Sequence, residues 1–481
     1  MLFKSNILRN LNNAELWRGG QGLCRYDTIG IVGTRSGGLP ALLILLLCGV
    51  PLTAQSAGQD PVTVSADHPR LLLRPARLRL LRRERQRTSA RWQQLQLFIA
   101  GHAPLPEPAF AEALYYQVSG DAAAGKRAIA AALGGSSDLR QQALVFDWCQ
   151  DLLNDAQRRE LTARLEKGLA EPPSDSIPAT RSRAFAAIAL YDHVPEIPQR
   201  ELNRIVHTWW QGKMVPAIEQ GRNAIPREDE YPLFELLHAI RDTANLDLRD
   251  ACPRFFRDLP LAHLMSYYPA IYQAPENDYR IGVSPKVGPP DLRQAALSRA
   301  AGLAMVAYDV NAQETQYLQG WLMHDRFILR GTFGAPYEFL WANPYQPGLS
   351  YFLVPLVYHN TDTGKLFVRS SWDDTAEWFG YFDGVMQMFA DGRVTVLDPR
   401  LLAKPSSLQG AVVCFGASTG KFQVNLTEEQ EVFILGLKPK APYLVEIDDE
   451  EMFEAPADTG GILELTDVPH GKPIGIRLKP E

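Results

Sequence analysis

The stretch KLFVRSSWDD, from Lys365 to Asp374, separates two parts of the chain that have different apolar patterns. Before it, apolar residues recur at the three- and four-residue spacing of helices. After it, they alternate with polar residues, and Gly and Asp turn signals divide the chain into short segments. The sequence therefore predicts an α+β protein in which a helical half is followed by an antiparallel β half.

The composition is that of an ordinary globular protein, with 46% hydrophobic and 22% charged residues among 481. This length is enough for two or three domains with a large core. A formal net charge of -6 argues against a nucleic-acid partner, because no basic domain stands out. The one basic run, Arg74 to Arg91, is interpreted as a solvent-facing helix.

The segment Leu39 to Val50, LPALLILLLCGV, is strongly apolar but too short to span a bilayer, which takes about 20 residues. It is typical of the apolar core of a secretory signal, and small residues from Ala54 to Ala57 offer a cleavage site. Residues 1–57 are therefore predicted to be a signal peptide with an over-extended N-terminus. The mature protein is expected to be periplasmic or secreted, with no stable membrane span.

Three cysteines follow the predicted signal, namely Cys149, Cys252 and Cys414. Their odd number and wide spacing predict no disulfide framework, although one pair could bridge in an oxidising compartment. The sequence contains no CxxC or HExxH motif and no close cluster of His and Cys. We therefore predict neither a metal site nor a cofactor.

The domain organisation follows from the connections between the apolar stretches. Helices with short Gly-, Pro- and Asp-rich connections predict an α/α toroid, complete or incomplete, over residues 58–330. Residues 331–364 are predicted to be a linker that faces a cleft, where Tyr337 and Trp341 stack on sugar rings or else pack against the helices. Residues 365–430 are predicted to form a β-sandwich, and residues 431–481 a small immunoglobulin-like β module.

Three segments of the chain resemble the heparinase II/III-like family of polysaccharide lyases. They are HPRLLLRPARLRLL, ALVFDWCQDLLNDAQRRELTARLEKGL and GKLFVRSSWDDTAEWFGYFDG, and the sharpest piece is RSSWDD. The resemblance covers roughly Ser65 to Asp398. In that family an α/α toroid precedes an antiparallel β-sandwich. The resemblance implies that an acidic polysaccharide binds between the two halves and is cleaved by β-elimination at a uronic acid.

β-Elimination requires a group that neutralises the uronate, a base and an acid. In the family a helix-borne Asn or His does the first task, and here Arg181 stands near that position. Tyr231, in NAIPREDEYPLFELL, is the candidate base or acid, and a neighbouring cation is expected to lower its pKa. Glu230 beside it is a candidate substrate contact. In the alternative interpretation, the Tyr231 ring packs under the helix and the acidic residues cap its first turn.

The family's histidine after the signature has no counterpart in WFGYFDGVMQMFADGRVTVLDP. Among the other histidines, His359 is closest in sequence to the signature and is the preferred substitute. Arg369 and Trp372 are candidates to bind a sugar carboxylate or sulfate. Alternatively, Arg369 pairs with Asp373 or Asp374, and Trp372 belongs to the core.

Three functions remain open from the sequence. The first is a lyase acting on acidic polysaccharide, and the second is a non-catalytic glycan-binding protein with the same fold. The third is a toroid glycoside hydrolase with two carboxylates, such as Asp229 with Glu230 or Asp278, placed across a cleft. Only the lyase forms an unsaturated uronic acid, which absorbs in the ultraviolet.

Overall fold

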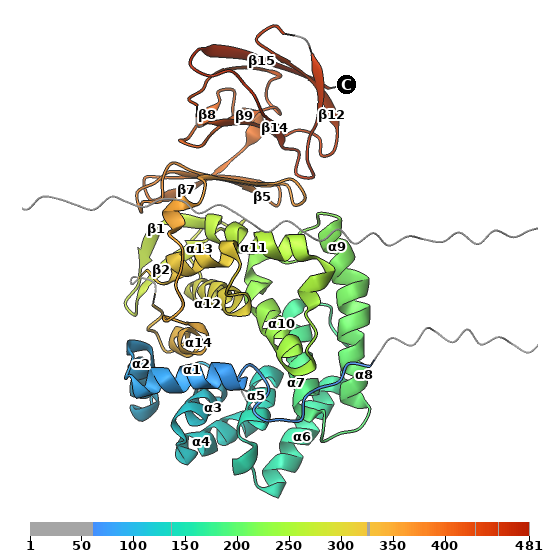
Figure 1. Ribbon diagram of the computed structural model, residues 1–481, viewed down its shortest axis with the longest axis vertical. Helices are drawn as coiled ribbons and strands as arrows, with labels where there is room; N and C mark the ends of the chain where they lie inside the picture. Colours follow the sequence, from blue (N-terminus) through green and yellow to red (C-terminus); the bar gives the residue numbers. More distant parts are fainter. Residues whose placement is uncertain (1–60, 136, 325–327, 429, 451, 481) are drawn as a thin grey trace, which may run out of the picture. The chain divides into compact units, whose positions relative to one another are not determined.

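The structure, a computed structural model, is shown in Figure 1, and the residues after Gln59 form one compact unit. It describes residues 61–135, 137–324, 328–428, 430–450 and 452–480. The predicted signal peptide, residues 1–57, lies outside these ranges. Within them, no helix combines the length and the apolar character that crossing a membrane requires.

Helices make up the first part of the described chain (Figure 1). The α-helices are α1 (Pro75–Gln86), α2 (Ala90–Ala100), α3 (Pro108–Ser119), α4 (Ala122–Leu133), α5 (Leu139–Trp148), α6 (Asp155–Ala170), α7 (Ile177–Leu190), α8 (Ile197–Asn203), α9 (Val215–Glu219), α10 (Glu230–Ala244), α11 (Pro253–Met265), α12 (Leu292–Tyr308), α13 (Gln313–Leu322) and α14 (Gly334–Trp341). A π-helix, η2 (Arg204–Met214), joins α8 to α9, and short 3-10 turns include η1 (Gln150–Leu152) and η3 (Arg227–Asp229).

Short polar residues begin several of these helices, which explains why the helices start where they do. The side chain of Asp138 accepts a hydrogen bond from the backbone N–H of Gln141 at the start of α5. Asn154 and Gln157 form a reciprocal capping box at the start of α6. Such caps satisfy backbone donors that would otherwise have no partner in the first turn.

The inner helices close a ring. Helix α3 packs on α5, α5 on α7, α7 on α10, α10 on α12, α12 on α14, and α14 returns to α3. Helices α7 and α12 are rich in buried alanine and are covered on almost every side, as expected for helices inside a bundle. The predicted α/α toroid followed by antiparallel β structure is confirmed.

The predicted linker, residues 331–364, is in part a structural member of this ring. Its first part forms helix α14, in which Tyr337 and Trp341 are each only 2% exposed. Their rings pack against neighbouring helices instead of forming an open surface for sugar rings. The Gly- and Pro-rich composition indicated a loop. The apolar residues of α14 are nevertheless stabilised as a helix because the other helices of the ring pack around them.

Strands make up most of the remaining chain. They are β1 (Tyr267–Gln273), β2 (Asp278–Gly282), β3 (Val357–Asn360), β4 (Lys365–Arg369), β5 (Trp378–Phe382), β6 (Val385–Ala390), β7 (Arg393–Leu397), β8 (Ser406–Ser407), β9 (Ala411–Phe415), β10 (Lys421–Asn425), β11 (Glu431–Leu435), β12 (Pro442–Ile447), β13 (Phe453–Pro456), β14 (Leu463–Leu465) and β15 (Pro473–Pro480).

Three sheets of these strands are stacked in layers. The order in the first is β3-β4-β5-β6-β7, in the second β14-β11-β9-β8, and in the third β10-β15-β12-β13. Strands β9 and β11 are parallel neighbours in the second sheet, and their side chains are buried on both faces. One face packs against the first sheet and the other against the third. This explains why both strands are apolar throughout, apart from the exposed Glu431 at the start of β11.

The boundary predicted at residue 430 divides two of these sheets. Strand β9, before the boundary, pairs with β11 after it, and β10 pairs with the final strand β15. A separate C-terminal module is therefore not seen, and residues 406–480 form one two-sheet unit. The turn signals located the strands, but the pairing of β10 with β15 is non-local and left no mark in the sequence pattern.

The first sheet packs on the helical half. Phe367, Trp378 and Phe389 belong to the same buried cluster as the inner helices. The indole N–H of Trp378 donates to the carbonyl of Met265 at 2.9 Å, which joins β5 to the end of α11. The signature strand β4 is thereby held against the helices.

Candidate functional site

The first turns of the inner helices bring a group of charged and aromatic side chains together. Glu107 precedes α3, Arg140 and Arg293 are the second residues of α5 and α12, and Tyr231 is the second residue of α10. We call this group the Glu235 cluster. It consists of Glu107, Arg140, Arg181, Tyr231, Glu235, Arg293, Tyr337 and Trp341.

Glu235 lies at the centre, and its side chain is fully buried. Arg140 donates to its carboxylate from Nη2 at 2.6 Å and from Nε at 3.0 Å. Arg181 donates from Nη1 to Oε2, which also accepts the bond from Arg140 Nε. Burial opposes ionisation of this carboxyl, but the two guanidinium groups outweigh it and hold the pKa of Glu235 below its ordinary value.

Tyr231 contacts the same carboxylate. Its hydroxyl donates to Glu235 Oε1 at 2.8 Å and accepts from the indole N–H of Trp341 at 3.1 Å. Burial and the charge of Glu235 raise the pKa of Tyr231 well above its ordinary value, although Arg140 acts in the opposite direction. The predicted lowering of this pKa is therefore wrong, because the nearby cations are paired with Glu235 and the ring is buried.

The cluster retains positive charge. Three guanidinium groups face two carboxylates, those of Glu107 and Glu235, and the starts of the helices add partial positive charge. Among the described residues, Nη1 of Arg140 has no hydrogen-bond acceptor and lies 3.5 Å from Glu107. The charges of the cluster would therefore balance with one further carboxylate.

The three arginines of the cluster differ in how far their side chains are exposed to solvent. The side chain of Arg140 is 2% exposed and that of Arg181 is 12% exposed, whereas that of Arg293 is 65% exposed. Arg293 Nη2 approaches Glu107 Oε1 at 3.7 Å, and the hydroxyl of Tyr337 donates to the same carboxylate. Of the three arginines, Arg293 is therefore the most exposed to solvent and Arg181 the next.

Glu230, one residue before Tyr231, belongs to a second buried group. His263 Nδ1 donates to Glu230 Oε2 at 2.6 Å, and the Tyr267 hydroxyl donates to His263 Nε2 at 3.2 Å. Ser298 lies 3.0 Å from the same hydroxyl and accepts from Arg227. Burial raises the pKa of Glu230, but His263 and Arg227 lower it by more than burial raises it. The pKa of Glu230 is therefore below its ordinary value. Glu230 is thus committed to His263 instead of facing a substrate.

The signature residues Arg369 and Trp372 contact each other, away from the Glu235 cluster. The Arg369 guanidinium lies 4.7 Å from the centre of the Trp372 ring and donates to the carbonyl of Tyr267. Arg369 is 4% exposed, and burial together with Arg280 lowers its pKa to about 9. Asp374 pairs with Arg280. The signature therefore joins the first sheet to the helical half, and its arginine is engaged by a backbone carbonyl and an aromatic ring.

His359 also lies apart from Tyr231. Its ring contacts Asp458 through Nε2 at 3.0 Å and Glu464 through Nδ1 at 2.7 Å, which joins β3 to the second sheet. Burial lowers its pKa, but the hydrogen bonds to these two carboxylates outweigh burial and raise it. The histidine chosen as a catalytic substitute is placed in an ion-paired contact between sheets.

The raised pKa of His359 predicts a pH-dependent stability. A group whose pKa is higher in the folded state stabilises the protein fully below its unfolded pKa of about 6.5, and this contribution is lost as pH rises through the folded pKa. His359→Gln is therefore expected to lower the free energy of unfolding by about 1–2 kcal/mol near pH 5.5, and by less above pH 7.5. Urea unfolding at both pH values measures the difference.

His207→Gln is the matched control, because the His207 ring contacts the neutral side chain of Gln211. It is expected to lower the free energy of unfolding near pH 5.5 by less than His359→Gln does, because no carboxylate contact is lost. If the destabilisation by His359→Gln grew with rising pH, the ion pair would not be the source of its effect.

The paired carboxylates of the hydrolase interpretation have different surroundings. Burial and the neighbouring Glu228 raise the pKa of Asp229. The pKa of Glu230 is lowered, and its carboxylate accepts a hydrogen bond from His263. Asp278 lies in β2, where it lines a small recess with Tyr267 and Arg280. These contacts do not bring the three carboxylates together around one open position.

Comparison with known proteins leaves the family open. No family model matches the chain, and no curated protein matches it. A solved structure described as a glycoside hydrolase has 10% sequence identity and a TM-score of 0.28, over 78% of this chain and 71% of that one. At this level the likeness carries no argument about activity.

The residues that the sequence did not indicate are Glu107, Arg140, Glu235 and Arg293. One signal was present, since Glu235 interrupts the apolar run in YPLFELL and a charge at such a position is expected to be buried and paired. Its partners come from other helices. These partners can be identified only from the packing of the helices in the folded ring.

Proposed function

We propose that the protein binds a uronic-acid-containing oligosaccharide at the Glu235 cluster and cleaves it by β-elimination. The observation that supports this best is that Arg181 and Tyr231 contact the same carboxylate, that of Glu235. One of them is a cation able to neutralise a uronate and the other a phenol able to handle a proton. These are two of the three chemical requirements of the reaction.

The sugar carboxylate is proposed to enter beside Arg293 and to pair with Arg181. Both guanidinium groups are reachable from solvent, and bidentate pairing with a planar carboxylate suits arginine. The positive excess of the cluster favours acidic over neutral sugars. Acidic oligosaccharides are therefore the substrate class that we propose.

Substrate binding would change the basicity of Glu235. Arg181 helps to hold the pKa of Glu235 down, so a uronate that shares Arg181 weakens this effect and makes Glu235 a better acceptor for the Tyr231 proton. The phenolate then takes the proton from the carbon next to the uronate. The bond to the leaving oxygen breaks as the carbon–carbon double bond forms. Tyr231 passes its proton to that oxygen, and Glu235 returns the first proton to Tyr231.

The proposal is tested by incubating the protein with heparan sulfate, hyaluronan, chondroitin and alginate, and with a carboxyl-reduced form of each as the control. A lyase releases product that absorbs in the ultraviolet from the native polymers and none from the reduced ones. Binding by calorimetry without product supports the non-catalytic alternative. New reducing ends without ultraviolet absorbance support the hydrolase.

Arg181→Met is expected to weaken binding of acidic oligosaccharide by about 1.5–3 kcal/mol, or roughly 10- to 150-fold, because a charge-assisted contact is lost. The fold should persist, since Arg140 and Tyr231 still pair with Glu235. Calorimetry with a defined acidic oligosaccharide measures the change.

Arg204→Met is the matched control, because this arginine also pairs with a glutamate, Glu201, at 2.8 Å but lies outside the Glu235 cluster. The Arg204→Met variant is expected to bind the acidic oligosaccharide with the same affinity as the unmutated protein. Equal affinity of Arg181→Met would remove Arg181 from the binding site.

A further inference from the structure

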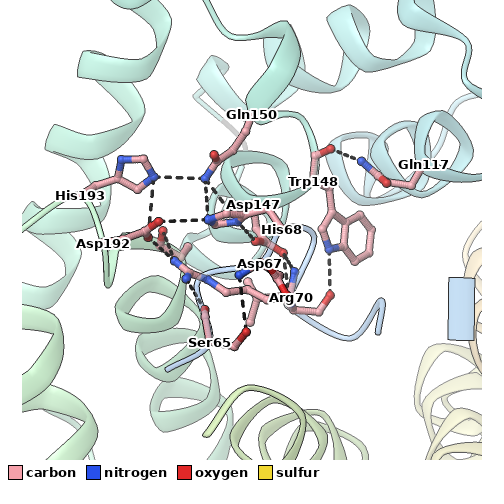
Figure 2. Close-up of polar contacts among 12 residues, drawn as sticks. Ser65, Asp67, His68, Arg70, Gln117, Asp147, Trp148, Gln150, Asp192 and His193 are labelled. Carbon is pink, nitrogen blue, oxygen red and sulfur yellow. Dashed lines mark hydrogen bonds and ion pairs between the residues drawn. The ribbon is translucent and has the colours of Figure 1, made fainter. Parts of the chain in front are cut away.

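Two histidines and an aspartate converge at the far ends of α5 and α7, away from the first turns that carry the Glu235 cluster. His68 comes from the segment before α1, and Asp192 and His193 follow α7. One ligand atom of each lies within 4.8 Å of the others. Figure 2 shows these side chains facing one another, with the amide of Gln150 between the two rings. The proposed function does not use this group.

Three of the separations are close to those around a metal ion, and His193 Nε2 lies farther, 3.9 Å from Asp192 Oδ1. His68 Nε2 lies 3.3 Å from Asp192 Oδ2, and the Gln150 amide nitrogen lies 3.2 Å from His68 Nε2 and 3.1 Å from His193 Nε2. Zinc bound at about 2.0–2.1 Å places its tetrahedral ligands about 3.3–3.4 Å apart. The amide oxygen of Gln150 takes the place of the nitrogen if the amide is turned over, and the two orientations have nearly the same shape.

The other ring nitrogen of His68 has the partner that metal-binding histidines use. Its Nδ1 lies 2.5 Å from Asp147 Oδ1, and the other oxygen of this buried carboxylate accepts from the backbone N–H groups of Arg70 and Leu71. A carboxylate at Nδ1 fixes the tautomer and turns the Nε2 lone pair toward the centre of the group. Figure 2 shows this chain of contacts from Asp147 through His68 to Asp192.

The local charge also favours a cation. With Nδ1 carrying the proton, His68 Nε2 and Asp192 Oδ2 are two acceptors facing each other at 3.3 Å. Arg70 pairs with the other oxygen of Asp192, which leaves Oδ2 for a metal. The ends of α5 and α7 add partial negative charge from their last carbonyl groups.

We infer that His68, Asp192 and His193, with Gln150 as a fourth ligand, form a structural site for a divalent transition-metal ion of the zinc class. Nitrogen and oxygen ligands without thiolate suit zinc, and also cobalt and nickel as probes. The ion joins the segment before α1 to the ends of α5 and α7. It lies at the end of these helices opposite to the Glu235 cluster, so its role is to stabilise the ring.

The test uses protein made without a histidine tag and stripped with chelator. Zinc is titrated against a chromophoric chelator, and cobalt is added separately for its visible spectrum. We expect one zinc per chain, a four-coordinate cobalt spectrum without a thiolate band, and a melting temperature raised by roughly 2–5 °C at saturating zinc. No zinc bound, or two or more bound with equal affinity, would overturn the inference.

Variants identify the ligands. His193→Ala and Asp192→Asn are each expected to weaken zinc binding at least about 10-fold, because each loses a ligand. His470→Ala is the matched control, since His470 is exposed and lies elsewhere in the β half. Circular dichroism confirms that each variant is folded. Zinc binding to folded His193→Ala as tight as to the unmutated protein would show that the ion binds elsewhere.

Discussion

Replacing Glu235 by alanine is expected to lower the free energy of unfolding by about 3–5 kcal/mol, the largest single effect that the structure predicts. The carboxylate is fully buried and is the shared partner of Arg140, Arg181 and Tyr231. Removing it leaves the Arg140 charge buried and without its main counter-ion, which costs more than the ion pair itself contributes. Urea unfolding followed by circular dichroism measures the loss.

Two comparisons isolate this cause. Glu160→Ala removes a glutamate that pairs with Arg164 at the surface, and it is expected to cost only about 0.3–0.5 kcal/mol. Adding Arg140→Met to Glu235→Ala removes the buried charge and is expected to recover part of the stability. A loss below 1 kcal/mol in the single variant, or a further loss in the double variant, would show that buried charge is not the cause.

Replacing Tyr231 by phenylalanine is expected to reduce turnover of an acidic polysaccharide by about 10²- to 10⁴-fold while binding stays within about threefold. The ring still packs edge-on against Tyr337, and only the hydroxyl that contacts Glu235 is lost. Some stability is lost as well, about 1–3 kcal/mol, because Glu235 and the Trp341 indole each lose a hydrogen-bond partner. The measurements are ultraviolet product formation and calorimetric binding.

Tyr337→Phe separates proton transfer from general disturbance of the cluster. Tyr337 is equally buried, but its hydroxyl donates to Glu107 instead of Glu235. It should retain most of the activity of the unmutated protein. Product formation by Tyr231→Phe at the full rate would remove Tyr231 from the mechanism.

The sequence predicts those parts of the fold that depend on local pattern. Apolar spacing and caps such as Asn154 located the helices, and alternation located the strands. Helix α14 was assigned to a linker because Gly334 and Pro336 resemble loop punctuation, whereas the surrounding ring keeps the segment helical. The pairing of β10 with β15 depends on residues far apart in the chain, and no local signal encodes it.

The candidate site was predicted in part. Arg181 and Tyr231 were placed together by a resemblance and do share one carboxylate. Arg369 was expected with them as the cation of the signature, and His359 because it is the candidate histidine closest in sequence to the signature. In the fold, Arg369 contacts Tyr267 and His359 contacts the second sheet. Sequence proximity to a motif says little about which buried charge an arginine or histidine meets.

The proposed metal ligands illustrate the same limit. A spacing rule finds ligands that are close in the chain, such as CxxC, and none was present. Here His68 and the pair Asp192-His193 are brought together only when α5 and α7 pack side by side. A search by sequence spacing has no means of connecting them.

The order of strands in the β half has a consequence for how the protein is made. Strands of the second and third sheets alternate in the sequence, and β10 pairs with β15, the last strand. During synthesis β10 therefore leaves the ribosome well before its partner β15. Helices and the first sheet can fold while synthesis continues, but the third sheet cannot close until Pro473 and the residues after it have emerged. A nascent chain that stalls before this point exposes the edges of β10 and β12, to which a strand of another chain can add.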